Sequence, residues 1–165
     1  MRDRQSAAGR PLVTPDITKT LLIVPCSSAK HDETGSSIHG ASILASLPKD
    51  LARDLAAARQ RVRHRAAVNE STLMPARLRY CGALYGSGGQ ALDDLMQQGA
   101  HIIILSGGYG AVLASEPIGK YDAPLKPAWW PNRILERTLI AYVRCHGIES
   151  VRAFASATSL SMANS

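Results

Sequence analysis

The chain has too few cysteines for a disulfide framework, and they are not spaced as in a zinc knuckle. Three are present among 165 residues, Cys26, Cys81 and Cys145, and no pair has the C-x-x-C spacing. Long apolar runs are also missing, since none approaches the ~20 residues of a membrane-spanning helix. Residues 1–5 lack the apolar core of a signal peptide. We therefore expect a cytoplasmic protein with no membrane partner.

The sequence has no internal repeat and no low-complexity tract, and its composition is that of an ordinary globular protein. Hydrophobic residues make up 45% of the chain, and the mean hydropathy is -0.06. Polar, proline-containing residues 1–19 predict a flexible arm. Residues 20–165 are long enough for one domain with a buried core. We expect this domain to be truncated at its C-terminus, because little sequence follows its last strand.

Positive charge is in excess, with 19 lysines and arginines against 13 acidic residues and a net charge of +6. This excess favours an anionic partner, either nucleic acid or a nucleotide-like ligand. Four arginines, Arg59, Arg61, Arg63 and Arg65, lie near the end of one predicted helix. They form either a solvated face or a set of contacts to nucleic-acid phosphates, whose strength would fall with salt.

The most informative stretch runs from His101 to Asp122. It opens with Ile102 to Leu105, an unbroken apolar run that is typical of a strand covered on both faces. The run ends in Ser106-Gly107-Gly108-Tyr109-Gly110, whose glycines permit positive φ and close approach of the backbone to a ligand. Such a loop at the carboxyl end of a strand is either a binding loop or a tight turn.

Two further apolar runs end in small or hydroxyl-bearing residues. Residues 21–24 lead into Pro25-Cys26-Ser27-Ser28-Ala29-Lys30, and residues 151–155 lead into Ser156-Ala157-Thr158-Ser159. Helices are predicted over 47–67, capped by Ser46, over 88–98, and from Pro131 to Gly147. Residues 69–75 read as a linker and 77–80 as a short strand. The order predicts a three-layer α/β fold, with a mostly parallel sheet and helices on both faces.

If the predicted strands are parallel neighbours, their carboxyl ends form one site. Lys30 is the candidate phosphate contact or amine nucleophile, because desolvation lowers the pKa of a lysine. Tyr109 and Glu116 complete the candidate catalytic set, although a tyrosine is equally suited to the core and the glutamate to an arginine partner. The candidate ligand-binding residues are Cys26, Ser27, Ser28, Tyr85, Ser106, Gly107, Gly108, Gly110 and Tyr121.

Tyrosine in this set would stack on a base or bond a ligand through its hydroxyl. Cys26 is either a reactive thiolate or a small buried residue. His31, Asp32, Glu33 and His39 are metal-ligand types, but their spacing fits no known site. We therefore predict no metal and no other cofactor. The sequence does not indicate an oligomeric state.

Four stretches resemble, in order, the YaaA peroxide-stress superfamily and its short relatives. They are L-I-V-P-C-S-S-A-K at 22–30, R-Y-C-G-A-L-Y-G at 79–86, L-S-G-G-Y-G-A-V-L-A-S-E-P-I-G-K-Y-D at 105–122, and the tryptophan before the last helix with the small residues after the final strand. The resemblance covers residues 20–159. It implies a YaaA-like α/β fold, a cytoplasmic location, a link to oxidative stress and DNA binding.

Two functions of different classes follow. The first is a protein that binds DNA, a nucleotide or a nucleobase in protection from oxidative stress. The second is an enzyme of nucleotide or modified-nucleobase chemistry, of the glycosidic-bond or base-transfer type. The basic helix favours binding, whereas the convergence of loops at the strand ends favours a small-molecule site.

Overall fold

Two apolar strands that pair in parallel form the centre of the sheet. In the computed structural model, which describes residues 14–32 and 39–154, β1 (Thr20–Pro25) lies beside β3 (His101–Ser106). Leu21 is opposite His101. Ile103 and Ile104 have no exposed surface, as expected for β-branched residues in a strand with both faces covered.

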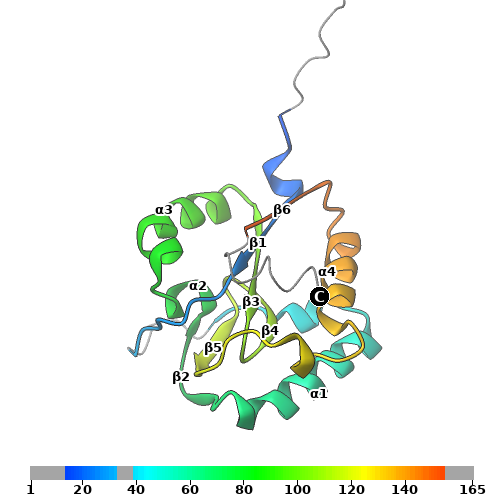
Figure 1. Ribbon diagram of the computed structural model, residues 1–165. Coiled ribbons are helices and arrows are strands. Elements are labelled where there is room, and N and C mark those ends of the chain that lie inside the picture. Colours follow the sequence, from blue (N-terminus) through cyan, green and yellow to red (C-terminus); the bar gives the residue numbers. More distant parts are fainter. Residues whose placement is uncertain (1–13, 33–38, 155–165) are drawn as a thin grey trace, which may run out of the picture.

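Two shorter strands complete this sheet. β6 (Ser150–Ala153) is parallel to β1, and β4 (Gly110–Leu113) is antiparallel to β3, which gives the order β4-β3-β1-β6. The predicted α/β class with a mostly parallel sheet is confirmed. In the view of Figure 1, the central strands lie between α3 (Ala83–Gln97) and α4 (Ile134–Cys145).

Helix α1 (Lys49–Arg65) packs against α4 and buries the predicted apolar stripe. The buried residues of α1 are Leu51, Leu55, Ala58 and Val62. The remaining helices are α2 (Ala76–Arg79) and the 3₁₀ turns η1 (Ile17–Lys19), η2 (Ile43–Ser46) and η3 (Pro127–Trp129). None of the helices in the described ranges is both long and apolar enough to cross a membrane.

Three predicted helix starts were wrong. Ser46 belongs to η2, and Pro48 precedes α1 without a side-chain cap. α3 begins at Ala83 rather than Gly88, so its first turns contain Tyr85. α4 begins at Ile134, because Asn132 and Arg133 adopt left-handed φ values of 57° and 53° after Pro131.

A second, two-stranded sheet replaces the predicted linker. β2 (Asn69–Pro75) pairs antiparallel with β5 (Pro117–Lys120). Local sequence did not reveal β2, because its hydrogen-bond partners lie more than forty residues later in the chain. The short strand predicted over 77–80 was also wrong, since these residues follow Pro75 into the helical turn α2 and then leave it at Tyr80.

The glycine loop is packed against a later segment of its own chain. A Cβ on Gly107 would lie 2.1 Å from the carbonyl oxygen of Ala123, and one on Gly108 would lie 2.6 Å from Cγ of Tyr121. Gly110 has a φ of 76°, which confirms the prediction that a glycine of this loop adopts positive φ. Gly107 and Gly108 therefore permit close approach by residues 121–124.

We predict that Gly108→Ala lowers the free energy of unfolding by about 1–3 kcal/mol, because the new methyl group overpacks the Tyr121 ring. Gly86→Ala is the matched control. Gly86 is exposed in α3 and a Cβ there meets nothing within 4 Å, so alanine should stabilise the helix by about 0.5–1 kcal/mol. Urea unfolding followed by circular dichroism measures both changes. Equal stability of the two variants would contradict the packing argument.

Candidate functional site

The loop after β1 and the end of β3 meet at one edge of the sheet. The N–H of Cys26 donates to the carbonyl of Leu105 at 3.0 Å, and Ser106 is the last residue of β3. Farther along the loop, Lys30 forms an antiparallel bridge with Tyr80. The parallel pairing of β1 with β3 thus brings the two predicted loops together.

Tyr121 lies at the centre of this edge. The Lys30 ammonium is 4.2 Å from the centroid of the Tyr121 ring. The Tyr121 hydroxyl accepts a hydrogen bond from Ser106 Oγ at 3.0 Å and shares another with the Tyr80 hydroxyl at 2.8 Å. The Tyr109 ring meets the Tyr121 ring edge-on, at 6.1 Å between centroids. Lys30, Ser106 and Tyr109 therefore surround a side chain rather than an open pocket.

We call this set the Lys30 cluster. Its members share the carboxyl edge of β1 and β3 and are Cys26, Ser27, Ser28, Lys30, Tyr80, Ser106 and Tyr121. The outer surface of the cluster consists of the loop after β1, where Ser28 is exposed and Cys26, Ser27 and Lys30 are partly exposed. A ligand reaching this edge would meet these side chains first.

Partial burial affects the pKa of Lys30. Loss of solvent lowers the pKa of its ammonium, and the nearby Cys26 and Asp122 partly oppose that shift. The ammonium donates to the carbonyl of Ser28 at 3.3 Å. Within residues 14–32 and 39–154, no carboxylate lies within ion-pair distance of Lys30.

The three predicted ligand-binding or catalytic tyrosines belong to the core. Tyr85, Tyr109 and Tyr121 are 6%, 8% and 2% exposed, so their ring faces are covered by protein. The Tyr85 hydroxyl donates to the carbonyl of Pro25 at 2.6 Å. Burial raises the pKa of all three hydroxyls above the usual range. These tyrosines therefore support the site as packed core residues and are not exposed to a ligand.

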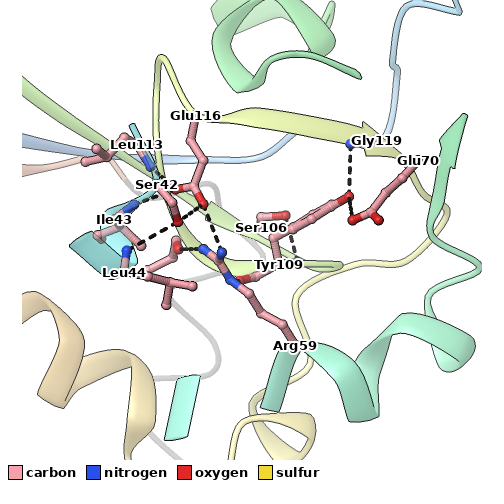
Figure 2. A network of polar contacts seen from close by, with 11 residues as sticks. Ser42, Ile43, Leu44, Arg59, Glu70, Ser106, Tyr109, Leu113, Glu116 and Gly119 are labelled. Atoms are coloured by element: carbon pink, nitrogen blue, oxygen red, sulfur yellow. Dashed lines mark hydrogen bonds and ion pairs between the residues drawn. The ribbon is translucent and has the colours of Figure 1, made fainter. Parts of the chain in front are cut away.

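Glu116 is engaged inside the fold (Figure 2). Its Oε1 accepts hydrogen bonds from Ser42 Oγ at 2.6 Å and from Arg59 Nη1 at 2.9 Å. Its Oε2 accepts from the N–H groups of Ile43 at 3.0 Å and Leu113 at 3.1 Å. Of the two roles open to Glu116 in the sequence, the structure shows the arginine pair.

Arg59 is likewise committed to internal contacts. Its Nε donates to the carbonyl of Tyr109 at 2.9 Å and its Nη2 to the carbonyl of Ala111 at 2.7 Å. With the side chain only 15% exposed, Arg59 does not belong to the outer face on which the sequence placed it. Its guanidinium instead holds the glycine loop and β4 against α1.

Tyr109 and Glu70 connect this network to a small cavity. The Tyr109 hydroxyl donates to Glu70 Oε1 at 3.0 Å and accepts from the N–H of Gly119 at 2.9 Å, as Figure 2 shows. Arg63 pairs with the other oxygen of Glu70 at 2.5 Å. A cavity of about 180 Å³ lies here, and its walls include Arg59, Arg63, Glu70, Gly108 and Tyr109, but not Lys30.

Of the four predicted arginines, Arg61 and Arg65 are exposed. Arg61 lines a second cavity of about 200 Å³ between α1 and the start of α4. That cavity also contains Arg137, which pairs with Asp54 at 3.4 Å. The outward basic surface of α1 is therefore smaller than the sequence predicted.

Three residues were not selected as site residues from the sequence: Tyr80 of the Lys30 cluster, Arg79 next to it, and Glu70 at the separate cavity beside Tyr109. Tyr80 was assigned to a strand, Glu70 to a linker, and Arg79 to the same strand as Tyr80. A signal was available for Arg79 and Tyr80, which open the R-Y-C-G-A-L-Y-G stretch, but not for Glu70. Ser156–Ser159 and Glu33 lie outside the described residues. Within the described residues, no group of three or more histidine, cysteine, aspartate or glutamate side chains is arranged to hold a metal ion.

Comparisons of the chain with family models, curated proteins and solved structures find no match. The site is therefore defined by its geometry. Lys30 is the cation that the fold places at the strand ends, whereas Glu116 and Arg59 neutralise each other inside the protein.

We predict that Glu116→Leu lowers the free energy of unfolding by about 3–5 kcal/mol, because it leaves the Arg59 guanidinium buried without its counter-charge. Chemical unfolding measures the loss. Asp50→Asn is the matched control, since Asp50 pairs with Arg53 at the exposed start of α1. Similar small losses in both variants would show that the Arg59–Glu116 pair does not hold the fold together.

All five tyrosines should resist ionisation until the protein unfolds. Burial raises the pKa of Tyr142 to about 12 and that of the other four beyond the usual range. Above about pH 10 the unfolded chain loses tyrosine protons that the folded chain retains, so stability is full below that pH and falls as pH rises.

An alkaline titration measures this effect. Tyrosinate absorbance should rise together with the loss of circular dichroism, in one transition. Absorbance that rises near pH 10 while the dichroism stays native would contradict the buried placement of the hydroxyls.

Proposed function

We propose that the chain is a short YaaA-like protein that binds an anionic, nucleotide-like ligand at the Lys30 cluster. The observation that carries this proposal is the partly buried Lys30 ammonium over the Tyr121 ring, at the carboxyl ends of two adjacent parallel strands. Open α/β sheets bind ligands at such ends. A lysine there is suited to a phosphate group as a point charge.

The hydroxyls beneath Lys30 support the same proposal. Ser106, Tyr80 and Tyr121 satisfy one another and fix the ring on which the ammonium rests. The cation is thus held in place before a ligand arrives, which reduces the entropy lost on binding. Ser27 and Ser28 lie on the same loop and supply hydroxyl and backbone groups for an anion.

The biological setting of the proposal comes from the family resemblance. A YaaA-like protein would have three layers, lie in the cytoplasm and contribute to protection from oxidative stress. Its ligand would then be a nucleotide, a nucleobase derivative or DNA. For DNA, Arg61 and Arg65 are the available contacts among the four predicted arginines, since Arg59 and Arg63 pair with Glu116 and Glu70.

An enzyme of nucleotide or modified-nucleobase chemistry is the second candidate. The observation that favours it is the lowered pKa of Lys30, which increases the fraction of uncharged amine near neutral pH. Such an amine is suited to glycosidic-bond or base-transfer chemistry. Binding and catalysis then differ in whether the ligand is recovered intact.

Lys30→Ala should reduce the affinity for adenine nucleotides by roughly tenfold or more, since one charge-assisted contact contributes about 1.5–3 kcal/mol. Isothermal titration calorimetry with AMP and ADP measures the change, and a short DNA duplex tested in parallel reports on the α1 arginines. Chromatography of the recovered nucleotide distinguishes binding from cleavage.

Lys126→Ala is the matched control. The Lys126 ammonium also lies over an aromatic ring, 4.7 Å from the centroid of Trp129 rather than over Tyr121. Its loss should leave nucleotide affinity unchanged. If the wild-type chain binds neither the nucleotides nor the duplex, the proposed function is wrong.

A further inference from the structure

Arg79 is a buried cation with unusual partners. Its side chain has no exposed surface and is the largest of the fully buried side chains. Its Nη1 donates to the carbonyl of His31 at 2.7 Å and its Nη2 to the carbonyl of Thr72 at 2.7 Å. Among residues 14–32 and 39–154, its Nε has no hydrogen-bond partner. Buried arginines are ordinarily paired with a carboxylate, so this one requires an explanation.

In the part of the chain that the structure describes, no carboxylate lies within ion-pair distance of Arg79, and Asp32 acts on its charge from farther away. The ion pairs of residues 14–32 and 39–154 include no partner for Arg79. Burial lowers the pKa of the guanidinium, the direction expected for a charge that has lost its water. The more distant Asp32 carboxylate opposes this shift, but within this part of the chain the Arg79 guanidinium is not neutralised by a direct ion pair.

The position of Arg79 links this charge to the Lys30 cluster. Its carbonyl accepts the N–H of His31 at 2.8 Å, while its guanidinium binds the carbonyl of the same residue. Arg79 thus forms two hydrogen bonds with His31, the residue that follows Lys30. The next residue, Tyr80, pairs with Lys30 itself.

We propose that Arg79 determines the ligand class of the Lys30 cluster, positioning Lys30 and adding a second, fixed positive charge that selects a phosphate-bearing ligand over a neutral one. This inference rests on the proposed function and adds the charge of the ligand. Arg79 acts through Lys30 and its field, since its buried nitrogens do not reach the surface. The nearby Lys120 adds less, because Asp32 pairs with it.

Adenosine, AMP and ADP, titrated at constant ionic strength, test the proposal. For the wild-type chain we expect affinity to rise roughly tenfold with each phosphate group. Arg79→Gln should flatten this rise and leave the affinity for adenosine unchanged. Arg79→Lys, which keeps the charge, should restore most of the rise.

Arg77→Gln is the matched control on the same helical turn, because its guanidinium already pairs with Asp93. Its affinity should rise from adenosine to AMP to ADP as it does for the wild type. Thermal unfolding of each variant separates a lost fold from a lost preference. If Arg79→Gln does not fold, a wild-type affinity that fails to rise from adenosine to ADP still overturns the role of Arg79.

The outcomes separate this inference from the proposed function. Wild-type protein that binds adenosine and AMP equally retains a ligand site but overturns the role of Arg79. If folded Arg79→Gln shows the same rise in affinity from adenosine to ADP as the wild type, the role of Arg79 is likewise overturned. Wild-type protein that binds none of the three compounds overturns both proposals.

Discussion

The buried pair of Arg59 and Glu116 is the constraint on which the rest of the structure depends. The carboxylate receives four hydrogen bonds, and the guanidinium reaches two carbonyls of the glycine loop and β4. One ion pair therefore joins η2, α1, β4 and the turn before β5. Because both charges are largely out of water, each needs the other, and these elements hold a single relative arrangement.

Tyr121 connects the glycine loop to the candidate site. Its ring occupies the space that Gly108 leaves open, and its hydroxyl bonds to Ser106 and Tyr80. The Lys30 ammonium lies over the same ring. The contacts that pack the glycine loop therefore also position the residues of the candidate site. Substitutions in the glycine loop should consequently affect Lys30 through the Tyr121 ring.

The sequence predicted what depends on local patterns. The apolar runs of β1 and β3, the stripe of α1 and the positive φ of Gly110 follow from periodicity and glycine chemistry. It missed what depends on distant partners. β2 is a strand because β5 pairs with it, and Arg59 lies inward because Glu116 approaches from fifty-seven residues away. Arg79 opens the R-Y-C-G-A-L-Y-G stretch, but its burial could not be predicted, because the carbonyls of His31 and Ile118 that bind it are far away in sequence.

The hydrogen bonds of Arg79 have a consequence for the order in which parts of the fold can form. Its guanidinium contacts carbonyls at residues 31 and 72, but also that of Ile118, and Lys30 lies over the Tyr121 ring, so the surroundings of Lys30 are incomplete until the chain extends past β5. Such long-range closures come late and slowly in folding. During synthesis on the ribosome, the parallel strands can meet only after β3 emerges, and the site can take shape only after β5. The Lys30 cluster is thus completed late in the synthesis of each chain, once Tyr121 has emerged.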